Sequence, residues 1–410
     1  MSLIYLDNHA TTRVDPRVLQ RMLPCFSEDY GNAASRSHAM GWRAEEHVSR
    51  ARGQVAALVH ADPREIIFTS GATESDNLAI QGVATALAHK GDHIVTAATE
   101  HKAVLDACAR MAARGLRVTV LPVDGEGRVS ARQVAEAITD ATILVSIMTA
   151  NNEVGVIAPL AEIGAVCRAR GVLLHTDGAQ ALGRIPIDVT AMNVDLLSMS
   201  AHKMHGPKGV GALFVRRGAP RIRLEPLFFG GGHERGLRSG TLDVPGIVGF
   251  GEAAAIAAEE MADEADRLRG LRDDLLARLR ASLPDLRVNG SMTHRLPNNL
   301  NVSIPFVEGE ALLMGLARTV AVSSGSACTS ATLEPSHVLR AMGVPDDDAH
   351  SSIRFGLGRF NNEDDIARAA DLVIAQAERL RAMSPRNPAS THGACVEVHP
   401  PIAGGLSRVQ

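Results

Sequence analysis

A series of short apolar runs, separated by longer helical patterns, occupies the first half of the chain and most constrains its fold. The runs are continuous and rich in Val, Ile and Leu, whereas a half-exposed strand would alternate apolar and polar residues. Such runs are typical of parallel strands covered on both faces. The sequence therefore predicts an α/β fold with a mostly parallel central sheet flanked by helices. The predicted strands are Glu65–Thr69, His93–Thr96, Arg117–Leu121, Ile143–Met148, Val172–Asp177 and Asp195–Ser200.

The second half of the chain has a different organisation. A helical pattern from about Glu252 to Ala281 predicts a connecting helix, and the strand-like Asn299–Ile304 follows it. Because 410 residues exceed what one hydrophobic core usually spans, we expect a second, smaller α+β domain. The expected division is a large domain over 13–255, a small domain from 1–12 and 256–383 with a Gly/Ser-rich loop at about 321–334, and a loosely ordered tail over 384–410.

Charge and composition exclude several classes of partner. The net charge is -4, no run of Lys or Arg stands out, and aromatic residues make up only 3%. Direct nucleic-acid binding is therefore not expected. The amino-terminal MSLIYLDNHATT lacks the basic and apolar regions of a signal peptide, and no apolar stretch is long enough to span a bilayer. We expect a cytoplasmic protein that does not contact a membrane.

The cysteines are scattered and form no C-x-x-C pair, so neither a metal site nor a disulfide framework is expected. Most of them fit small buried side chains within helical patterns. Cys328 differs, because Ser, Gly, Ala and Thr flank it in a loop that we expect to be exposed and mobile, as a nucleophilic thiol requires. The five are Cys25, Cys108, Cys167, Cys328 and Cys395.

Nucleotide-binding motifs are missing from the places where they would be expected. No G-x-G-x-x-G follows the first predicted strand, and the chain contains no Walker A sequence. The glycines of Gly230–Gly236 have the wrong spacing for a dinucleotide site. Functions that need a nicotinamide or ATP site therefore lose support.

The segment Ile66–Asn77 reads as a strand, a loop and the start of a helix. Gly71, Ala72 and Thr73 fall where a helix N-terminus presents free N–H groups and hydroxyls to an anion, and Gly71 would let the backbone approach a phosphate. The alternative is an ordinary helix N-cap, which this segment alone would favour.

Asp177 and Lys203 follow two further predicted strands at their carboxyl ends, where ligands bind in α/β sheets. Asp177 could hold the protonated ring nitrogen of a pyridoxal cofactor, and Gln180, about one helical turn later, could reach the same ligand. Lys203 is a candidate for a Schiff base, with its pKa lowered by burial and nearby positive charge. The alternatives are a turn aspartate and a surface lysine.

His101 follows the predicted strand His93–Thr96 and so joins the same edge of the sheet. A histidine there could stack on a planar cofactor and move protons. A surface histidine is the alternative, in a chain with 16 histidines. The sequence thus places a phosphate cradle, an acid, an amine and an imidazole at neighbouring strand ends.

These residues lie in motifs that resemble the cysteine desulfurases, in the class-V aminotransferase group of fold-type I pyridoxal-phosphate transferases. The resemblance runs from Tyr5-Leu6-Asp7 to Ile353-Arg354-Phe355. SSGSACTSATLEPSHVLRAMG at 323–343 resembles the long catalytic loop of the housekeeping and nitrogenase-associated subgroup. The other motifs are GNAASRSH at 31–38, TSGATESDN at 69–77, NNEVG at 151–155, HTDGAQ at 175–180, SAHKMHGPKGVGAL at 200–213 and GGGHERGLRSGTL at 230–242.

The resemblance implies pyridoxal 5'-phosphate as the cofactor and a role for each matching residue. Lys203 would form the Schiff base and transfer protons, Asp177 would pair with the pyridine nitrogen, and Gln180 with the ring hydroxyl. His101 would stack on the ring and assist proton transfer. The implied phosphate and remaining cofactor contacts are Ala72, Thr73, Asn152, Ser200, His202 and, toward the neighbouring subunit of a homodimer, Thr241.

The resemblance also implies a substrate and a reaction. Asn152 and Arg354 would bind the carboxylate of L-cysteine, which the fork of an arginine matches well. Cys328 would take the substrate sulfur as a persulfide, leaving alanine, and would pass it to an iron–sulfur scaffold protein or a sulfur carrier. Transient ligation of an iron–sulfur cluster by Cys328 is the only metal contact expected.

Alternatives remain open within and beyond this family. A selenocysteine lyase would share the cofactor site without needing Cys328 as nucleophile. An aminotransferase would need a second keto-acid substrate, to which no residue points, and a non-catalytic scaffold would not need the site residues at all. The tail at 384–410, with Cys395, does not resemble the docking segment of housekeeping members. The sulfur acceptor thus stays open among general iron–sulfur assembly, nitrogenase maturation and the thiolation of tRNA or DNA.

Overall fold

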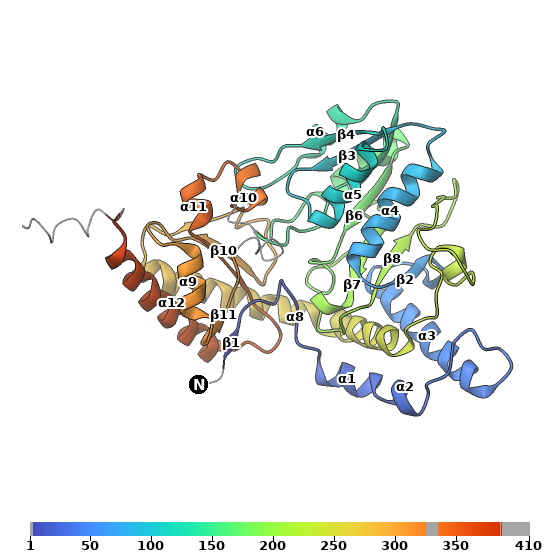
Figure 1. Ribbon diagram of the computed structural model, residues 1–410, viewed down its shortest axis with the longest axis horizontal. Coiled ribbons are helices and arrows are strands. Elements are labelled where there is room, and N and C mark those ends of the chain that lie inside the picture. The colour runs from blue at the N-terminus through green and yellow to red at the C-terminus, as the bar shows by residue number, and fades with distance from the viewer. Residues whose placement is uncertain (1–2, 325–334, 386, 388–410) are drawn as a thin grey trace, which may run out of the picture.

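The computed structural model describes residues 3–324, 335–385 and 387. Within them, a seven-stranded sheet forms the centre of the larger half of the molecule, with helices on both faces (Figure 1). The order is β2-β8-β7-β6-β5-β3-β4, and only β8 runs opposite to the others. This confirms the predicted mostly parallel sheet. The strands are β2 (Ile66–Thr69), β3 (His93–Ala97), β4 (Arg117–Leu121), β5 (Thr142–Ser146), β6 (Leu173–Asp177), β7 (Leu196–Ser200) and β8 (Gly211–Val215).

The sequence prediction places these strands well, with two differences. Each predicted strand is present, and its ends shift by at most two residues. The sequence analysis missed β8, which lies antiparallel between β2 and β7. β4 is not covered on both faces as expected, because it is the edge strand, and its Val120 is 50% exposed.

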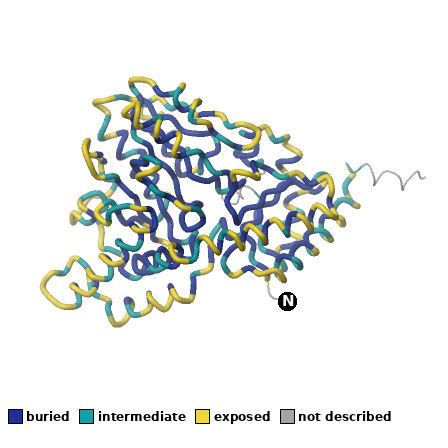
Figure 2. The backbone as a smooth tube through the Cα atoms, turned by 180° about the vertical axis from the view of Figure 1, so that it is seen from behind, coloured by how far each residue is buried: buried dark blue, intermediate teal, exposed yellow. Residues whose placement is uncertain are grey.

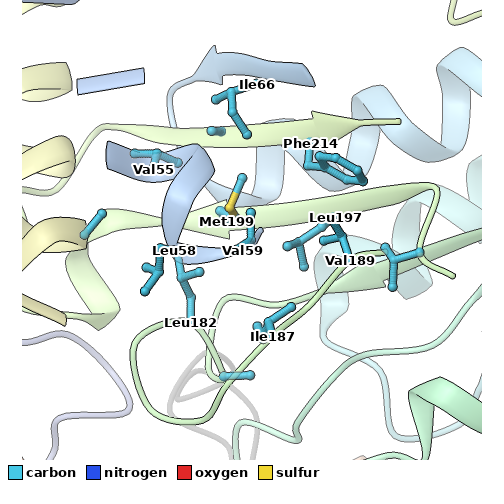
Figure 3. Close-up of a cluster of buried hydrophobic side chains, with 14 of the residues drawn as sticks. Val55, Leu58, Val59, Ile66, Leu182, Ile187, Val189, Leu197, Met199 and Phe214 are labelled. Carbon is cyan, nitrogen blue, oxygen red and sulfur yellow. The ribbon is translucent and has the colours of Figure 1, made fainter. Parts of the chain in front are cut away.

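Alternate residues of the strands pack against two separate sets of helices. Ile66 and Phe68 of β2 join the core beneath α3, α6, α7 and the first half of α8, whereas Ile67 faces α4 and α5. Figure 3 shows Ile66, Leu197 and Phe214 of three strands meeting side chains from the end of α3. The helices are α1 (Pro16–Met22), α2 (Pro24–Ser27), α3 (Ala39–Leu58), α4 (Ala72–Ala86), α5 (Lys102–Ala112), α6 (Ala131–Ala137), α7 (Leu160–Arg170) and α8 (Val244–Ser282).

A second core lies at the other end of α8, around a three-stranded antiparallel sheet in the order β12-β10-β9. The amino-terminal strand β1 pairs in parallel with β11 beside it, so the amino-terminal segment joins this part of the molecule (Figure 1). The elements are β1 (Ile4–Tyr5), β9 (Arg287–Val288), β10 (Asn299–Ser303), β11 (Val320–Ala321), β12 (Ser352–Gly356), α9 (Gly309–Leu316), α10 (His337–Ala341), α11 (Asp346–His350) and α12 (Glu363–Met383).

The long helix α8 belongs to both cores. Its residues from Val244 to Ala257 pack under the large sheet, and those from Leu268 to Leu279 pack in the second core. The division of the chain between 255 and 256 stays a prediction. Most of the strands are buried, while α8 and α12 show exposed outer faces (Figure 2). Among the described residues, no helix has the length and apolar character needed to cross a membrane.

Candidate active site

A cavity of about 540 Å³ opens where the parallel strands of the large sheet end. Segments that follow β2, β3, β5, β6 and β7 line it, and Ala10 and Arg354 close it from the side of the second core. Thr241 is not among the lining residues and is exposed just before α8. Cys328 lies outside the described residues. The cavity brings together these expected site residues: Ala72, Thr73, His101, Asn152, Asp177, Gln180, Ser200, His202, Lys203 and Arg354.

One end of the cavity is a helix N-terminus that begins at a glycine. Gly71 is the N-cap residue of α4 and has a φ of +150°. It has no side chain that could accept hydrogen bonds from the first N–H groups of the helix, so these groups are left for another acceptor. A Cβ on Gly71 would meet nothing within 4 Å, whereas one on Gly211 would lie 2.6 Å from the Gly71 Cα. The two backbones therefore approach as closely as only glycine allows. This arrangement fits a bound phosphate.

The opposite wall of this end comes from the short 3-10 helix Ala201–Lys203 that follows β7. His202 lies hydrogen-bonded to Thr11, with 3.1 Å between Nδ1 and Oγ1. Burial, followed by the positive charges of Lys203 and Lys208, lowers the pKa of His202 to about 4. A neutral His202 between two lysines leaves this end of the cavity positive, as an anion site requires.

A buried carboxyl group stands at the end of β6. Asp177 is 5% exposed, and its Oδ1 accepts a hydrogen bond of 2.8 Å from the Ala179 N–H. Burial raises the pKa of Asp177, while the positive charges of His101 and Lys203 act in the opposite direction. The segment after β6 forms turns and not the expected helix, yet it still brings Gln180 to the cavity.

The residues behind Asp177 supply no positive charge. His175 is fully buried between Ser146 and Ser198, which lie 2.8 and 2.9 Å from its ring nitrogens, and burial lowers its pKa to about 3. Burial also raises the pKa values of Asp76 and Glu100 well above their usual range. A cationic N–H group in the cavity would therefore stabilise the Asp177 carboxylate.

Lys203 points its amine at the amino-terminal segment of the chain. Its Nζ donates hydrogen bonds to the carbonyl oxygens of His9, at 2.6 Å, and Ala10, at 2.8 Å. Because Lys203 ends the short 3-10 helix that directly follows β7, the fold fixes its Cα while the long side chain reaches the amino-terminal segment. Its amine and the Asp177 carboxyl group thus line one cavity from neighbouring strands.

A buried guanidinium group also lines the cavity. Arg354 lies on β12 and is 2% exposed. Its Nη1 donates to the Asn152 carbonyl at 2.8 Å, and its Nη2 donates to Asp7 Oδ1 at 3.0 Å and to Ser323 Oγ at 2.7 Å. These contacts join the second core to the loop after β5 and hold a cation at the wall of the cavity.

Known proteins are similar to this chain in sequence and in fold. The family model for class-V aminotransferases matches residues 4–369. The chain is 59% identical to the cysteine desulfurase IscS of Anaeromyxobacter sp. (strain Fw109-5) over 93% of this chain and 94% of that protein. The protein of the same name from Escherichia coli O139:H28 is 56% identical with the same coverage. A solved structure of a NifS-like protein superposes with a TM-score of 0.85 at 39% identity, covering 93% of this chain and 99% of that one.

The chain belongs to the class-V aminotransferase family, as a cysteine desulfurase. The resemblance inferred from the motifs is thereby confirmed, and so is the fold-type I architecture. Enzymes of this family use pyridoxal 5'-phosphate. In this cysteine desulfurase the cavity fits that group on its own geometry. Gly71 leaves open space before a helix N-terminus, and a buried acid and an amine line the same cavity.

Several site residues of this cysteine desulfurase were missed by the sequence analysis. His9, Glu153 and His337 line the cavity, and Asp7 holds Arg354. Asp7, Glu153 and His337 lie in motifs that carry the resemblance and His9 lies two residues after Asp7, but their residue types alone indicated no role. Only the topology shows that β1 and β12 bring the two ends of the chain to one cavity.

The described cysteines of the enzyme do not fit a nucleophile. Cys25, Cys108 and Cys167 are buried. Burial raises the pKa of Cys25, and it raises the pKa values of Cys108 and Cys167 to about 12. A thiol must ionise to attack sulfur, so these three agree with their predicted structural role.

Proposed function

We propose that this cysteine desulfurase binds pyridoxal 5'-phosphate in the described cavity and passes the sulfur of L-cysteine to Cys328. The observation that carries the proposal is the set of groups around one cavity. A helix N-terminus, an amine, a buried acid and a buried guanidinium group all line this cavity. Together they match the phosphate, aldehyde and pyridine nitrogen of the cofactor and the carboxylate of an amino acid.

The cofactor would be held from three sides. Thr73, Ser200 and His202, with the N–H groups at Ala72, would bind its phosphate, and Asp177 its ring nitrogen. His101 would stack on the ring. When bound, the cofactor supplies an electron sink next to the substrate Cα. The Asp177 carboxylate keeps the ring nitrogen protonated, because burial favours a neutralised ion pair over a lone charge.

Three further residues would bind the substrate and transfer protons. Arg354 and Asn152 would bind the carboxylate of cysteine, which fixes the direction of its Cα–H bond. Lys203 Nζ would take the Cα proton and later return a proton to carbon. The amine lies in the cavity between Asp177 and the amino-terminal carbonyls that it contacts, which suits a group that must swing between two positions.

Sulfur transfer would follow at Cys328. The Cys328 thiolate attacks the substrate sulfur, a new S–S bond forms, and the C–S bond of the substrate breaks. The electron pair of the broken bond stays on carbon, which takes a proton and becomes the methyl group of alanine. The product on the enzyme is a persulfide, and no external oxidant is needed. The raised pKa values of Cys108 and Cys167 support assigning this step to another cysteine.

The proposal extends to partners. A homodimer would let the exposed Thr241 reach the phosphate of the neighbouring subunit. The persulfide sulfur would go to a scaffold protein for iron–sulfur clusters or to a sulfur carrier in the cytoplasm, as the name that the curated relatives share suggests. The small domain, from 1–12 and 256–383, would carry the segment with Cys328 to these acceptors.

The test compares wild-type protein with Cys328→Ser and, as a matched control, Cys25→Ser. Purified protein with cofactor is given cysteine, and alanine is measured. We expect Cys328→Ser to retain the yellow cofactor but to lose alanine formation by more than a hundredfold, and Cys25→Ser to retain both. Full activity of Cys328→Ser on cysteine would refute the assignment. Activity of that variant on selenocysteine alone would favour a selenocysteine lyase.

A further inference from the structure

His9 is a buried histidine in the cavity wall that the proposed chemistry does not use. It is 2% exposed and lies between Gln180 and β12. A Cβ on Gly356 would lie 2.8 Å from His9 Cδ2, so the backbone of β12 packs directly on the imidazole edge. The ring therefore has a fixed place, and its contacts have a fixed direction.

Two hydrogen bonds connect His9 with Gln180. Gln180 Nε2 donates to the His9 carbonyl oxygen at 3.0 Å, and His9 Nδ1 lies 2.8 Å from Gln180 Oε1. Only an NH₂ group can face a carbonyl oxygen, so the first bond fixes which end of the Gln180 amide is nitrogen. The amide oxygen then faces His9, and Nδ1 must carry the proton that this oxygen accepts.

The charge state of His9 fits this arrangement. Burial, together with the positive charge of Arg354, lowers the pKa of His9 to about 3. The imidazole is therefore neutral at working pH, with its proton on Nδ1. The pair closes a ring of two hydrogen bonds, in which each residue donates once and accepts once.

A consequence for the cavity follows from counting the amide hydrogens. Gln180 Nε2 carries two N–H groups, of which the His9 carbonyl accepts one. Gln180 lines the cavity and has its oxygen turned toward His9, so it offers the cavity a donor and no acceptor. Such a group stabilises an anionic oxygen. The same His9 carbonyl accepts from Lys203, so His9 contacts both groups that face the reactive end of the cofactor.

We propose that His9 is a positioning residue, which holds Gln180 as a hydrogen-bond donor toward the ring oxygen of the cofactor. The inference rests on the proposed function, because it needs the cofactor in this cavity. Without the Nδ1–H group, Gln180 Oε1 would be left buried without a donor, and the amide would keep only its bond to the carbonyl oxygen of residue 9. The amide could then rotate about that single contact, and its second N–H group would no longer be held toward the ring oxygen.

The loss of this donor should change the visible absorbance of the holoenzyme as a function of pH. Bound pyridoxal 5'-phosphate shares a proton between the Lys203 nitrogen and the ring oxygen, and the visible absorbance reports its loss as the pH rises. A donor on the ring oxygen stabilises the negative charge there and favours loss of the proton. Removing that donor raises the midpoint pH of the absorbance change, by about one pH unit for a hydrogen bond to a charged group.

The experiment titrates the visible band of holoenzyme with pH for His9→Leu, His9→Asn and His93→Leu. We expect His9→Leu to raise the midpoint by about one pH unit. His9→Asn should restore it, because an asparagine amide supplies the N–H donor. His93 is an equally buried histidine, 3% exposed, bonded to Thr142 and Thr119 at the far end of the sheet. His93→Leu should leave the midpoint unchanged.

A double variant separates positioning from simple packing. In a Gln180→Leu background, His9→Leu should shift the midpoint no further, since the effect passes through Gln180. An unchanged midpoint in His9→Leu, or a further shift in the double variant, would overturn the role of His9 while leaving the proposed function intact. If His9→Leu does not fold, a raised midpoint in His9→Asn overturns the role as well. Wild-type protein that shows no visible band with the cofactor would overturn both.

Discussion

Asp7 and Arg354, which are 347 residues apart in the chain, form a partly buried ion pair behind the wall of the cavity, with Arg354 Nη2 3.0 Å from Asp7 Oδ1. The same Nη2 donates to Ser323, so the arginine that we assign to the substrate carboxylate is held before any substrate arrives. A fixed guanidinium loses little conformational freedom when it binds a carboxylate.

Removing Asp7 should weaken both the fold and substrate binding. Asp7→Ala leaves the 3% exposed Arg354 side chain without its anionic partner, and we expect a loss of about 2 kcal/mol in the free energy of unfolding. The KM for cysteine should rise about tenfold, as expected for a loss of about 1.4 kcal/mol of binding free energy. Urea unfolding and steady-state kinetics measure the two effects. Asp266→Ala, which breaks the exposed pair with Arg269 on α8, should change neither by much. Equal effects from both variants would contradict this account.

Glu153 predicts a specific pH dependence of stability. Ser336 Oγ donates to its carboxyl group, which is buried, and burial raises its pKa from the usual 4.5 to about 7. Between these values the unfolded chain has lost the proton and the folded chain keeps it. The free energy of unfolding therefore falls as the pH rises through this range, and the deficit stays constant above pH 7.

Glu153→Gln removes this titration, since the amide is neutral throughout. The stability of the variant relative to wild type should rise between about pH 5 and pH 8, by up to about 3 kcal/mol. Chemical unfolding at several pH values measures it, and Glu136→Gln on the exposed face of α6 is the control. A difference that does not vary with pH would show that Glu153 is ionised in the folded protein at pH 5.

The close approach of Gly71 and Gly211 gives a third prediction. A Cβ on Gly211 would lie 2.4 Å from the Met199 carbonyl oxygen and 2.6 Å from the Gly71 Cα, which are backbone atoms that cannot move aside. Gly211→Ala should cost about 2–4 kcal/mol of stability and reduce cofactor affinity at least tenfold. Gly53→Ala is the matched control, because its Cβ would enter open space on α3. That variant should gain up to about 1 kcal/mol. Chemical unfolding and cofactor titration test both variants. A Gly211→Ala variant with unchanged stability and unchanged cofactor affinity would contradict the assignment of the phosphate site beside Gly71.

The sheet could be predicted from the sequence because its strands are continuous apolar runs that end at chemically distinctive residues. β8 was missed because Gly211–Val215 follows a glycine-rich segment and runs against its neighbours. The start of α8 was placed about eight residues late, at Glu252 and not Val244, because glycines weaken the helical pattern there. Close packing requires glycine there, since a Cβ on Gly249 would lie 2.5 Å from Met22 Sδ.

Without the family motifs, the site could be predicted mainly where a residue stands at or just after a strand end. Asp177, Lys203 and His101 were assigned from that position, and all three line the cavity. Contacts between distant segments left no signal in the sequence. The carboxyl group of Glu264 on α8 joins Arg184 and Arg359 through bonds of 2.5 and 2.7 Å, and neither charge spacing nor periodicity pairs these residues. The same is true of His9 with Gln180.

Cys328 lies outside the described residues, so its assignment as the sulfur acceptor needs a direct measurement. The holoenzyme is mixed with one equivalent of cysteine, quenched, digested without reductant and examined by peptide mass spectrometry. The account predicts one added sulfur atom on the peptide with Cys328 and none on the peptides with Cys25, Cys108, Cys167 or Cys395, together with one alanine. Alanine formed with no sulfur on Cys328 would contradict it.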